Sequence, residues 1–424
     1  MRSKAWRLLA IVITAGLAGP VLSVAPSQAT DSARPDPAVI TRWNTIAART
    51  IFTENTTPIP ASGLYFGFVS IAVHDAVVTI KGGYRPYLKQ PKVRGRASSE
   101  AAAATAAYQV LKYYFPASAA NLAADYAEAL AGIPDGAAKD RGKQVGTAAA
   151  ESLIRSRLHD GRNADILLTV SPAPGVWRPT PDAFAQMAVP WLGFVTPLAL
   201  RSPTQFRLPG PDSIKSKAYA RDFAEVKSKG AKEGSTRTAA ETETALFWNA
   251  NSVLQYQTAL RDQVTRRGWG IVESARAFAL LGTSTADALI ACWRAKYDYA
   301  YWRPITAIRL ADTDGNRRTQ SDPAWNALVQ TPPYPDYVSG HASVTGAATG
   351  VFSYLFGADS LDLDISSSVT STTRHYTSAA VLDAETMKAR IWLGLHFRRA
   401  MIDANGLGHR AAAWTIGHEF RPRR

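Results

Sequence analysis

The stretch KYDYAYWRP, residues 296–304, is the most informative part of this sequence, together with two shorter segments further along the chain. These are YPDYVSGH, residues 334–341, and RIWLGLH, residues 390–396. Each segment places basic or histidine side chains among aromatic and apolar neighbours. Taken together, the three predict a site for a tetrahedral, multiply charged oxyanion.

The first segment contributes two cations. Lys296 and Arg303 are separated by about two turns of an ideal helix, so a continuous helix would place both side chains on one face. Two cations on one face repel each other unless an anion lies between them. Pro304 disfavours helical geometry at Arg303. The alternative interpretation is a surface pair beside a tyrosine-rich stripe, with Asp298 either a partner of Arg303 or a surface acid.

The second segment leads into an apolar run, residues 342–351, that predicts a buried helix. Ser339 and Gly340 then lie near the helix N-terminus, where unpaired amides and the positive dipole end bind anions. Gly340 lets an oxyanion approach the backbone, and Ser339 adds a hydroxyl. His341 titrates near neutral pH. The alternative is an ordinary helix cap.

The third segment reads as helical and apolar. In that frame Arg390 and His396 lie on neighbouring faces and can line one pocket. Taken singly, they are equally typical of a salt-bridging arginine and a buried histidine.

The order of three motifs along the chain resembles the signature of a known superfamily. The motifs are Lys-x6-Arg-Pro, then Ser-Gly-His, then Arg-x5-His. It joins type 2 phosphatidic acid phosphatases, bacterial acid phosphatases and vanadium-dependent haloperoxidases. The segments HDAV (74–77), WRPTP (177–181) and ALFW (245–248), and the helix expected over 97–115, are similar to its soluble bacterial haloperoxidase-like branch. The resemblance implies an all-α helical bundle of the type 2 phosphatidic acid phosphatase/chloroperoxidase type.

The resemblance also implies roles for the matched residues. His341 would act as an acid and base, His396 as the axial vanadium ligand or the nucleophile toward phosphorus, and Lys296 would polarise the bound group. The residues implied to bind the oxygens of vanadate or phosphate are Lys296, Arg303, Ser339, Gly340 and Arg390.

Three functions remain open on these residues. The first is a secreted vanadate-dependent haloperoxidase, which oxidises halide with hydrogen peroxide to hypohalous acid equivalents. The second is a secreted acid phosphatase that hydrolyses small phosphate esters through a phosphohistidine, and the third an inactive helical anion-binding protein. Related phosphatases carry Asp four residues after the histidine, where this chain has Ala400, which favours the peroxidase. Asp403 is a possible substitute, unless Arg398 or Arg399 pairs with it.

The organisation of the chain follows from composition and periodicity. Basic residues at 2, 4 and 7, an apolar run over 8–18 and Ser-Gln-Ala at 27–29 predict a signal peptide over 1–29 and an exported protein. We expect an N-terminal helical region (30–171), an irregular proline-rich connection (172–237) and a catalytic helical region (238–424). Helical patterns cover 98–111, 121–131, 137–155, 238–250 and 272–302. Lys227 to Lys232 predicts a solvated turn, and no stretch after the signal peptide is expected to lack charges for long enough to span a membrane.

Composition excludes several classes of protein. With 46% hydrophobic residues and a net charge of +14, the chain has ample core material and attracts anions. Its basic residues are scattered, which argues against nucleic acid as a partner. Cys292 is the single cysteine and predicts a buried, inert thiol. Asp312 to Asn316 predicts a plain turn, and the remaining histidines lack zinc-site spacing: His74, His159, His375, His409 and His418.

Overall fold

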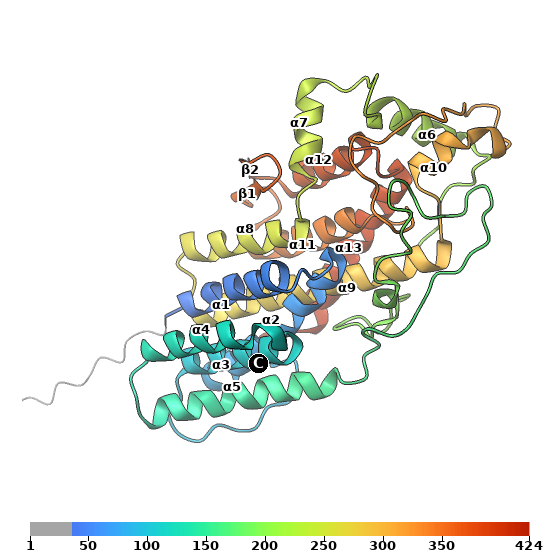
Figure 1. Ribbon diagram of the computed structural model, residues 1–424. Helices are drawn as coiled ribbons and strands as arrows, with labels where there is room; N and C mark the ends of the chain where they lie inside the picture. The colour runs from blue at the N-terminus through green and yellow to red at the C-terminus, as the bar shows by residue number, and fades with distance from the viewer. Residues whose placement is uncertain (1–35, 424) are drawn as a thin grey trace, which may run out of the picture. The chain divides into compact units, whose positions relative to one another are not determined.

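The computed structural model describes residues 36–423. The predicted signal peptide, residues 1–29, lies outside the described residues. The elements of the first half are helices, several of them joined by short π or 3-10 turns (Figure 1). They are α1 (Ala38–Ala48), η1 (Arg49–Glu54), α2 (Ile59–Lys81), α3 (Ser99–Tyr114), η2 (Pro116–Ser118), α4 (Ala119–Ala131), α5 (Ala137–Ser156) and η3 (Pro190–Phe194).

The second half is also helical, apart from one antiparallel hairpin. Its helices are α6 (Lys217–Gly230), α7 (Ala239–Phe247), α8 (Ser252–Arg266), α9 (Ile271–Tyr299), α10 (Pro304–Arg309), η4 (Ala311–Thr313), α11 (Gly340–Phe356), α12 (Ala379–Trp392) and α13 (Arg398–His418). The hairpin pairs β1 (Leu363–Ser367) with β2 (Thr372–Tyr376). The expected all-α bundle is therefore confirmed.

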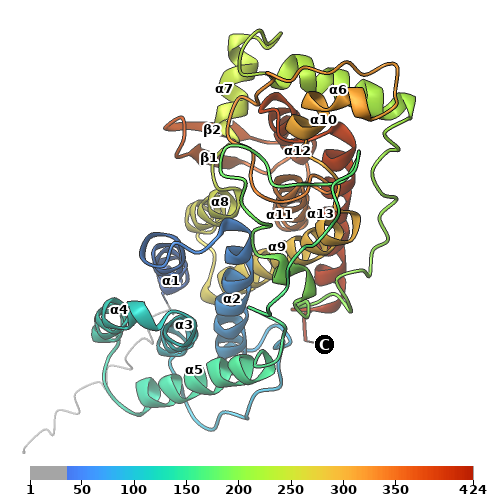
Figure 2. The same cartoon turned by 45° about the vertical axis from the view of Figure 1, so that its right-hand side comes forward.

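Helix α9 is the central element of the bundle. It packs against α2 on one side and against α11 and α13 on the other, as the two views show (Figures 1 and 2). The contact with α2 is close because Gly67 and Gly282 face each other. A Cβ atom on Gly282 would lie 3.1 Å from the Cα of Gly67. The bundle therefore surrounds α9, which carries the first cation of the expected site.

Helix α2 corrects one expectation from the sequence. Residues 59–81 are long and apolar enough to cross a membrane by length and composition, with a mean hydropathy of 1.6. In the structure, 83% of that window is buried inside the protein. Its polar residue Asp75 accepts hydrogen bonds from the backbone amides of Tyr87 and Leu88, at 2.6 and 2.8 Å. The helix thus serves as a core element, and its apolar composition reflects burial on all sides.

Helix caps lie where the sequence places them. The Ser98 hydroxyl accepts a hydrogen bond from the Ala101 amide at 3.1 Å and begins α3. Thr238 and Glu241 form a reciprocal capping box at the start of α7. Such caps satisfy amides that have no partner inside the helix.

The segment 172–237 is only partly the irregular connection that we expect. It contains α6, whose first turn is capped by Ser216. Lys227 and Lys229 lie in the last turn of that helix, so the predicted solvated turn is wrong at these positions. Lys229 pairs with Glu241 at 2.8 Å. The sequence predicts an irregular segment throughout because prolines are frequent before residue 212, but the helical pattern of α6 begins after them.

Candidate active site

Lys296 and Arg303 meet, but not through a shared helix. Helix α9 ends at Tyr299 because Ala300 adopts a left-handed conformation with φ of 40°. Arg303 is extended, with φ of −80° and ψ of 155°, as its position before proline predicts. The expected common helical face is therefore wrong. The chain instead turns back, and both cations lie 4.9 Å from the centre of the Tyr334 ring.

Backbone carbonyl groups hold the three cations in place. Lys296, Arg303 and Arg390 donate hydrogen bonds of 2.6 to 3.1 Å, each to one or two carbonyl oxygens. The accepting residues are Pro335, Asp336, Tyr334, Leu395 and Trp248. Carbonyl oxygens orient a cation without neutralising it, so this site keeps its positive charge.

Among the described residues, these buried cations have no salt-bridge partner. Lys296 and Arg303 are 0% exposed and Arg390 is 2% exposed. Within residues 36–423, no carboxylate lies within 4.0 Å of any of the three. The Nη2 atom of Arg303 and the Nε atom of Arg390 have no hydrogen-bond partner in the same range. Buried charges of one sign are costly alone, so the site is complementary to a bound oxyanion.

Arg390 and His396 are joined by a turn rather than by a helix. Helix α12 ends at Trp392, and Gly394 has a positive φ of 80°. A Cβ atom there would lie 2.6 Å from the Gly230 carbonyl oxygen, so the turn requires glycine. The helical frame predicted for this segment is wrong. The turn nevertheless brings His396 Nε2 to 3.2 Å from Arg303 Nη1.

Ser339, Gly340 and His341 stand at the start of α11, as predicted. The Ser339 hydroxyl caps the helix by accepting an amide hydrogen bond of 3.4 Å. Gly340 is the first helical residue, and a Cβ atom on it would lie 3.1 Å from the Trp293 ring. His341 Nε2 donates to the Ala250 carbonyl at 3.2 Å. This helix end therefore adds a hydroxyl, an unpaired amide end and an oriented imidazole to the cage formed by the cations.

The electrostatics of the site follow from burial and crowding. Burial lowers the pKa of Lys296 to about 7, and burial assisted by the charge of Arg303 lowers the pKa of Arg390 to about 10. Burial also lowers the pKa of both histidines well below the usual value, assisted by Arg390 at His341 and by Arg303 at His396. Both imidazoles are therefore neutral at neutral pH.

One acidic residue of the site is missed by the sequence analysis. Asp336 Oδ1 lies 2.8 Å from His396 Nδ1, with both side chains buried. Asp403, the expected substitute for the absent acid, instead accepts hydrogen bonds from a tyrosine hydroxyl and from Arg399 at 2.6 and 2.8 Å. Arg398 pairs elsewhere. Asp336 is the one acid in segment 334–341. Its place inside one of the three motif segments was the signal in the sequence that could have identified it.

Trp248 supports the cage from the segment ALFW. Its carbonyl accepts from Arg390 Nη1 at 3.0 Å, and its indole Nε1 donates to Glu385 at 2.8 Å. Glu385 also accepts from Arg374 and Tyr376, each at 2.6 Å. The Glu385 carboxylate thus bonds to the Trp248 indole and not to the Arg390 guanidinium. It leaves the charge of Arg390 without a direct ion pair.

Other residues singled out in the sequence lie apart from this chemistry. Asp298 pairs with Arg294 at 2.8 Å and is therefore a surface acid. Cys292 is buried, and burial raises the pKa of its thiol, as expected for an inert cysteine. Asp314 accepts hydrogen bonds that close a local turn, in agreement with the predicted turn.

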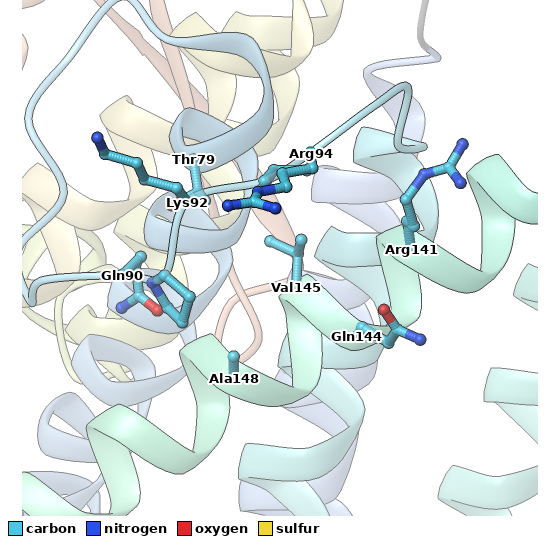
Figure 3. Close-up of a pocket in the computed structure, with 10 residues that line it drawn as sticks. Thr79, Gln90, Lys92, Arg94, Arg141, Gln144, Val145 and Ala148 are labelled. Carbon is cyan, nitrogen blue, oxygen red and sulfur yellow. The ribbon is translucent and has the colours of Figure 1, made fainter.

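A separate cavity of about 430 Å³ lies between α2, the loop after it and α5 (Figure 3). Lys92, Arg94 and Arg141 line it, together with apolar side chains that include Val145 and Ala148. The Arg141 guanidinium points away from Arg94 and donates to a backbone carbonyl through Nε. No histidine or acid lines this cavity, so it lacks groups for acid and base chemistry.

Comparison with known proteins places this site in context. Residues 276–422 match the family model of the VCPO second helical-bundle domain. A vanadium chloroperoxidase of Curvularia inaequalis is 36% identical over 83 residues. That match covers 17% of this chain and spans 13% of the length of the relative. The matched model region contains every residue of the cage.

Solved structures extend the likeness to most of the chain. The structure of a bacterial vanadium-dependent iodoperoxidase is similar with a TM-score of 0.76 and 22% identity, covering 91% of this chain and 97% of that one. A holo-type bacterial vanadium-dependent chloroperoxidase is similar with a TM-score of 0.66 and 19% identity, covering 84% and 91%. At these identities the likeness establishes the fold. The resemblance expected from the sequence is confirmed.

Proposed function

We propose that this chain is a vanadate-dependent haloperoxidase that oxidises halide ions with hydrogen peroxide. The observation that carries the proposal is the cage of three buried, carbonyl-held cations within the region that matches the chloroperoxidase domain model. Halide oxidation follows X⁻ + H₂O₂ + H⁺ → HOX + H₂O. The reaction consumes a proton and therefore needs a group that delivers one.

The residues of the cage fit vanadate. Arg303 and Arg390 each keep a buried N–H group without a partner in the described chain, and no carboxylate competes for them. Lys296, Ser339 and the Gly340 amide complete a set of donors suited to a tetrahedral oxyanion. His396 Nε2 would be the nitrogen that holds the vanadium. When bound, vanadate supplies an oxidising centre through which an oxygen atom of hydrogen peroxide reaches the halide.

His341 is the residue suited to move the proton. Its Nε2–H is held by the Ala250 carbonyl, so the lone pair of the neutral ring is on Nδ1. An anion in the cage raises the pKa of this ring, because it offsets the positive charge of Arg390 and Arg303. His341 thus holds a proton more readily when the cage is filled, and Nδ1 is the atom from which it can deliver that proton to the developing hydroxide.

A second candidate function is hydrolysis of phosphate monoesters in the absence of vanadate. The observation that favours it is the contact between Asp336 and His396, which supplies the carboxylate that Ala400 fails to provide. Ala400 therefore does not count against a nucleophilic His396. The same cage that binds vanadate also suits the transition state of phosphoryl transfer.

Two assays separate these functions. The first measures oxidation of iodide, bromide and chloride by hydrogen peroxide, with and without added orthovanadate. The second measures hydrolysis of an aryl phosphate without vanadate. Halide oxidation that requires vanadate and disappears in His396→Ala is the expected result. Hydrolysis without any halide oxidation would instead identify a phosphatase, and phosphate binding with neither activity an inactive anion-binding protein.

Export from the cell is part of the same proposal. It rests on the basic start, apolar run and small-residue cleavage pattern of residues 1–29. N-terminal sequencing of the protein recovered from culture medium is expected to begin near Thr30. Recovery of uncleaved protein from the cytoplasm alone would contradict this part of the proposal.

A further inference from the structure

The His396 imidazole is held at both of its nitrogen atoms. Its Nδ1 lies 2.8 Å from the Asp336 carboxylate, and its Nε2 lies 3.2 Å from the Arg303 guanidinium. The side chains of His396 and Asp336 are 3% and 1% exposed. Water therefore has little access to either contact, and the protein determines which nitrogen carries the proton.

The two contacts agree on a single tautomer. An ionised carboxylate only accepts hydrogen bonds, so it selects a proton on Nδ1. A guanidinium only donates, so it selects a lone pair on Nε2. Arg303 also lies 3.5 Å from Nδ1, but that contact is longer and a proton on Nδ1 makes it unfavourable. The geometry thus describes a neutral ring with Nδ1–H toward Asp336 and a lone pair on Nε2.

Asp336 is itself fixed by its backbone. Its amide donates to the Tyr301 carbonyl at 2.9 Å, and its own carbonyl accepts from Lys296 at 3.1 Å. The preceding carbonyl, of Pro335, also accepts from Lys296 at 2.6 Å. One segment therefore orients a cation of the cage through its carbonyls and the histidine through its carboxylate.

We propose that Asp336 is a positioning residue that holds His396 in the Nδ1–H tautomer and so presents the Nε2 lone pair to the oxyanion in the cage. The identity of that oxyanion rests on the proposed function, but the role of Asp336 does not. Coordination of vanadium and attack on phosphorus both require an unprotonated Nε2. A carboxylate placed behind a histidine ligand in this way orients the ring and increases its basicity.

The chain offers a matched control. Asp403 is the acid that sequence spacing favours, yet its carboxylate bonds to Tyr337 and Arg399 and makes no hydrogen bond to His396. Position 400, where related phosphatases carry the acid, contributes only a carbonyl, which accepts from the Ser339 amide at 3.2 Å. A purely structural role for Asp336 would change stability and leave the tautomer unchanged.

The test uses the full chain without vanadate, with histidine side chains labelled with ¹⁵N. Long-range ¹H–¹⁵N correlation spectra at about pH 8 distinguish the two neutral tautomers, and loss of one signal in His396→Ala assigns the ring. The wild-type protein and Asp403→Asn are expected to show Nδ1–H at His396. Asp336→Ala is expected to show a mixture, and Asp336→Asn, which keeps an accepting oxygen, an intermediate state.

Oxyanion affinity is the second readout. Equilibrium dialysis with orthovanadate is expected to show a loss of about 10- to 100-fold in Asp336→Ala, a smaller loss in Asp336→Asn, and none in Asp403→Asn. If Asp336→Ala does not fold, the proposal is tested by the His396 tautomer of the wild-type protein and by the tautomer and affinity of Asp336→Asn. A wild-type ring with Nε2–H, or an Asp336→Asn variant with unchanged tautomer and affinity, would overturn the proposal. Absence of halide oxidation with the expected tautomer and affinities would reject only the proposed function.

Discussion

Helix α9 carries two fully buried charges, Asp287 and Lys296, that the protein treats in opposite ways. Asp287 accepts hydrogen bonds from three consecutive backbone amides, at 2.6 to 2.8 Å, and thereby fixes the segment 198–200 against the helix. Lys296 bonds only to carbonyl oxygens and shares its surroundings with two further cations. Both side chains are 0% exposed. Burial of a charge therefore does not mark a functional site, whereas burial without compensation does.

Removal of the compensated charge should have the largest effect. Asp287→Ala leaves three buried amides without an acceptor, and we expect the free energy of unfolding to fall by roughly 3–5 kcal/mol. Urea titration followed by circular dichroism measures this change. Oxyanion affinity of the folded variant should remain that of the wild type. A loss of stability below about 1 kcal/mol would show that the two charges do not differ as described.

Removal of an uncompensated charge should lower anion affinity and leave the stability of the fold intact. In Arg390→Met we expect sulfate or phosphate affinity to fall about 100-fold, since charge-assisted hydrogen bonds are lost. Stability should stay constant or rise by about 1 kcal/mol, because an unpaired buried charge disappears. Calorimetric titration and urea unfolding provide the two measurements.

Arg294→Met is the control for this variant, since Arg294 is partly exposed and pairs with Asp298. It should leave anion affinity intact. A similar loss of affinity in both variants would indicate a general effect of net charge rather than a specific cage.

A smaller effect is expected from pH. The pKa of Lys296 is lowered to about 7, chiefly by burial, so its positive charge is present below that pH and is lost above it. The pKa of Asp336 is raised by burial to about 7, and its negative charge appears over the same range. Loss of the Lys296 charge weakens sulfate binding as pH rises through 7, by up to about tenfold per unit, because Lys296 lies in the cage whereas the Asp336 carboxylate faces His396. Sulfate is the suitable probe because its own charge stays constant, and Lys296→Met should flatten most of the slope. A sulfate affinity that rises with pH would contradict this account.

The members of the cage could be predicted from the sequence, but their geometry could not. Motif order named Lys296, Arg303 and Arg390, and in the structure all three are buried and donate to backbone carbonyls. Helical periodicity then predicted the wrong relation among them, because α9 ends at a left-handed alanine, Ala300, and α12 ends before the glycine turn at Gly394. Such terminations depend on tertiary contacts, including the close approach of another backbone to Gly394. Periodicity alone contains no information about them.

Asp336 shows a second limit of sequence reasoning. Its partner His396 lies in a different segment, so no local spacing connects the two, and attention to the residues after the histidine led to Asp403 instead. Helices with clear caps, such as α3 and α7, were predictable because their signals are local. Contacts between distant segments require the fold.

The most direct test of the cage is a crystal structure with tungstate, a tetrahedral oxyanion whose metal is located by anomalous scattering. We predict one strong site, bounded by Lys296, Arg303 and Arg390 and next to His396 Nε2. The site should be absent in Arg390→Met. Tungstate bound only at surface cations, such as those of the cavity near Arg94, with no density beside His396, would contradict the central claim that these buried cations form an oxyanion site.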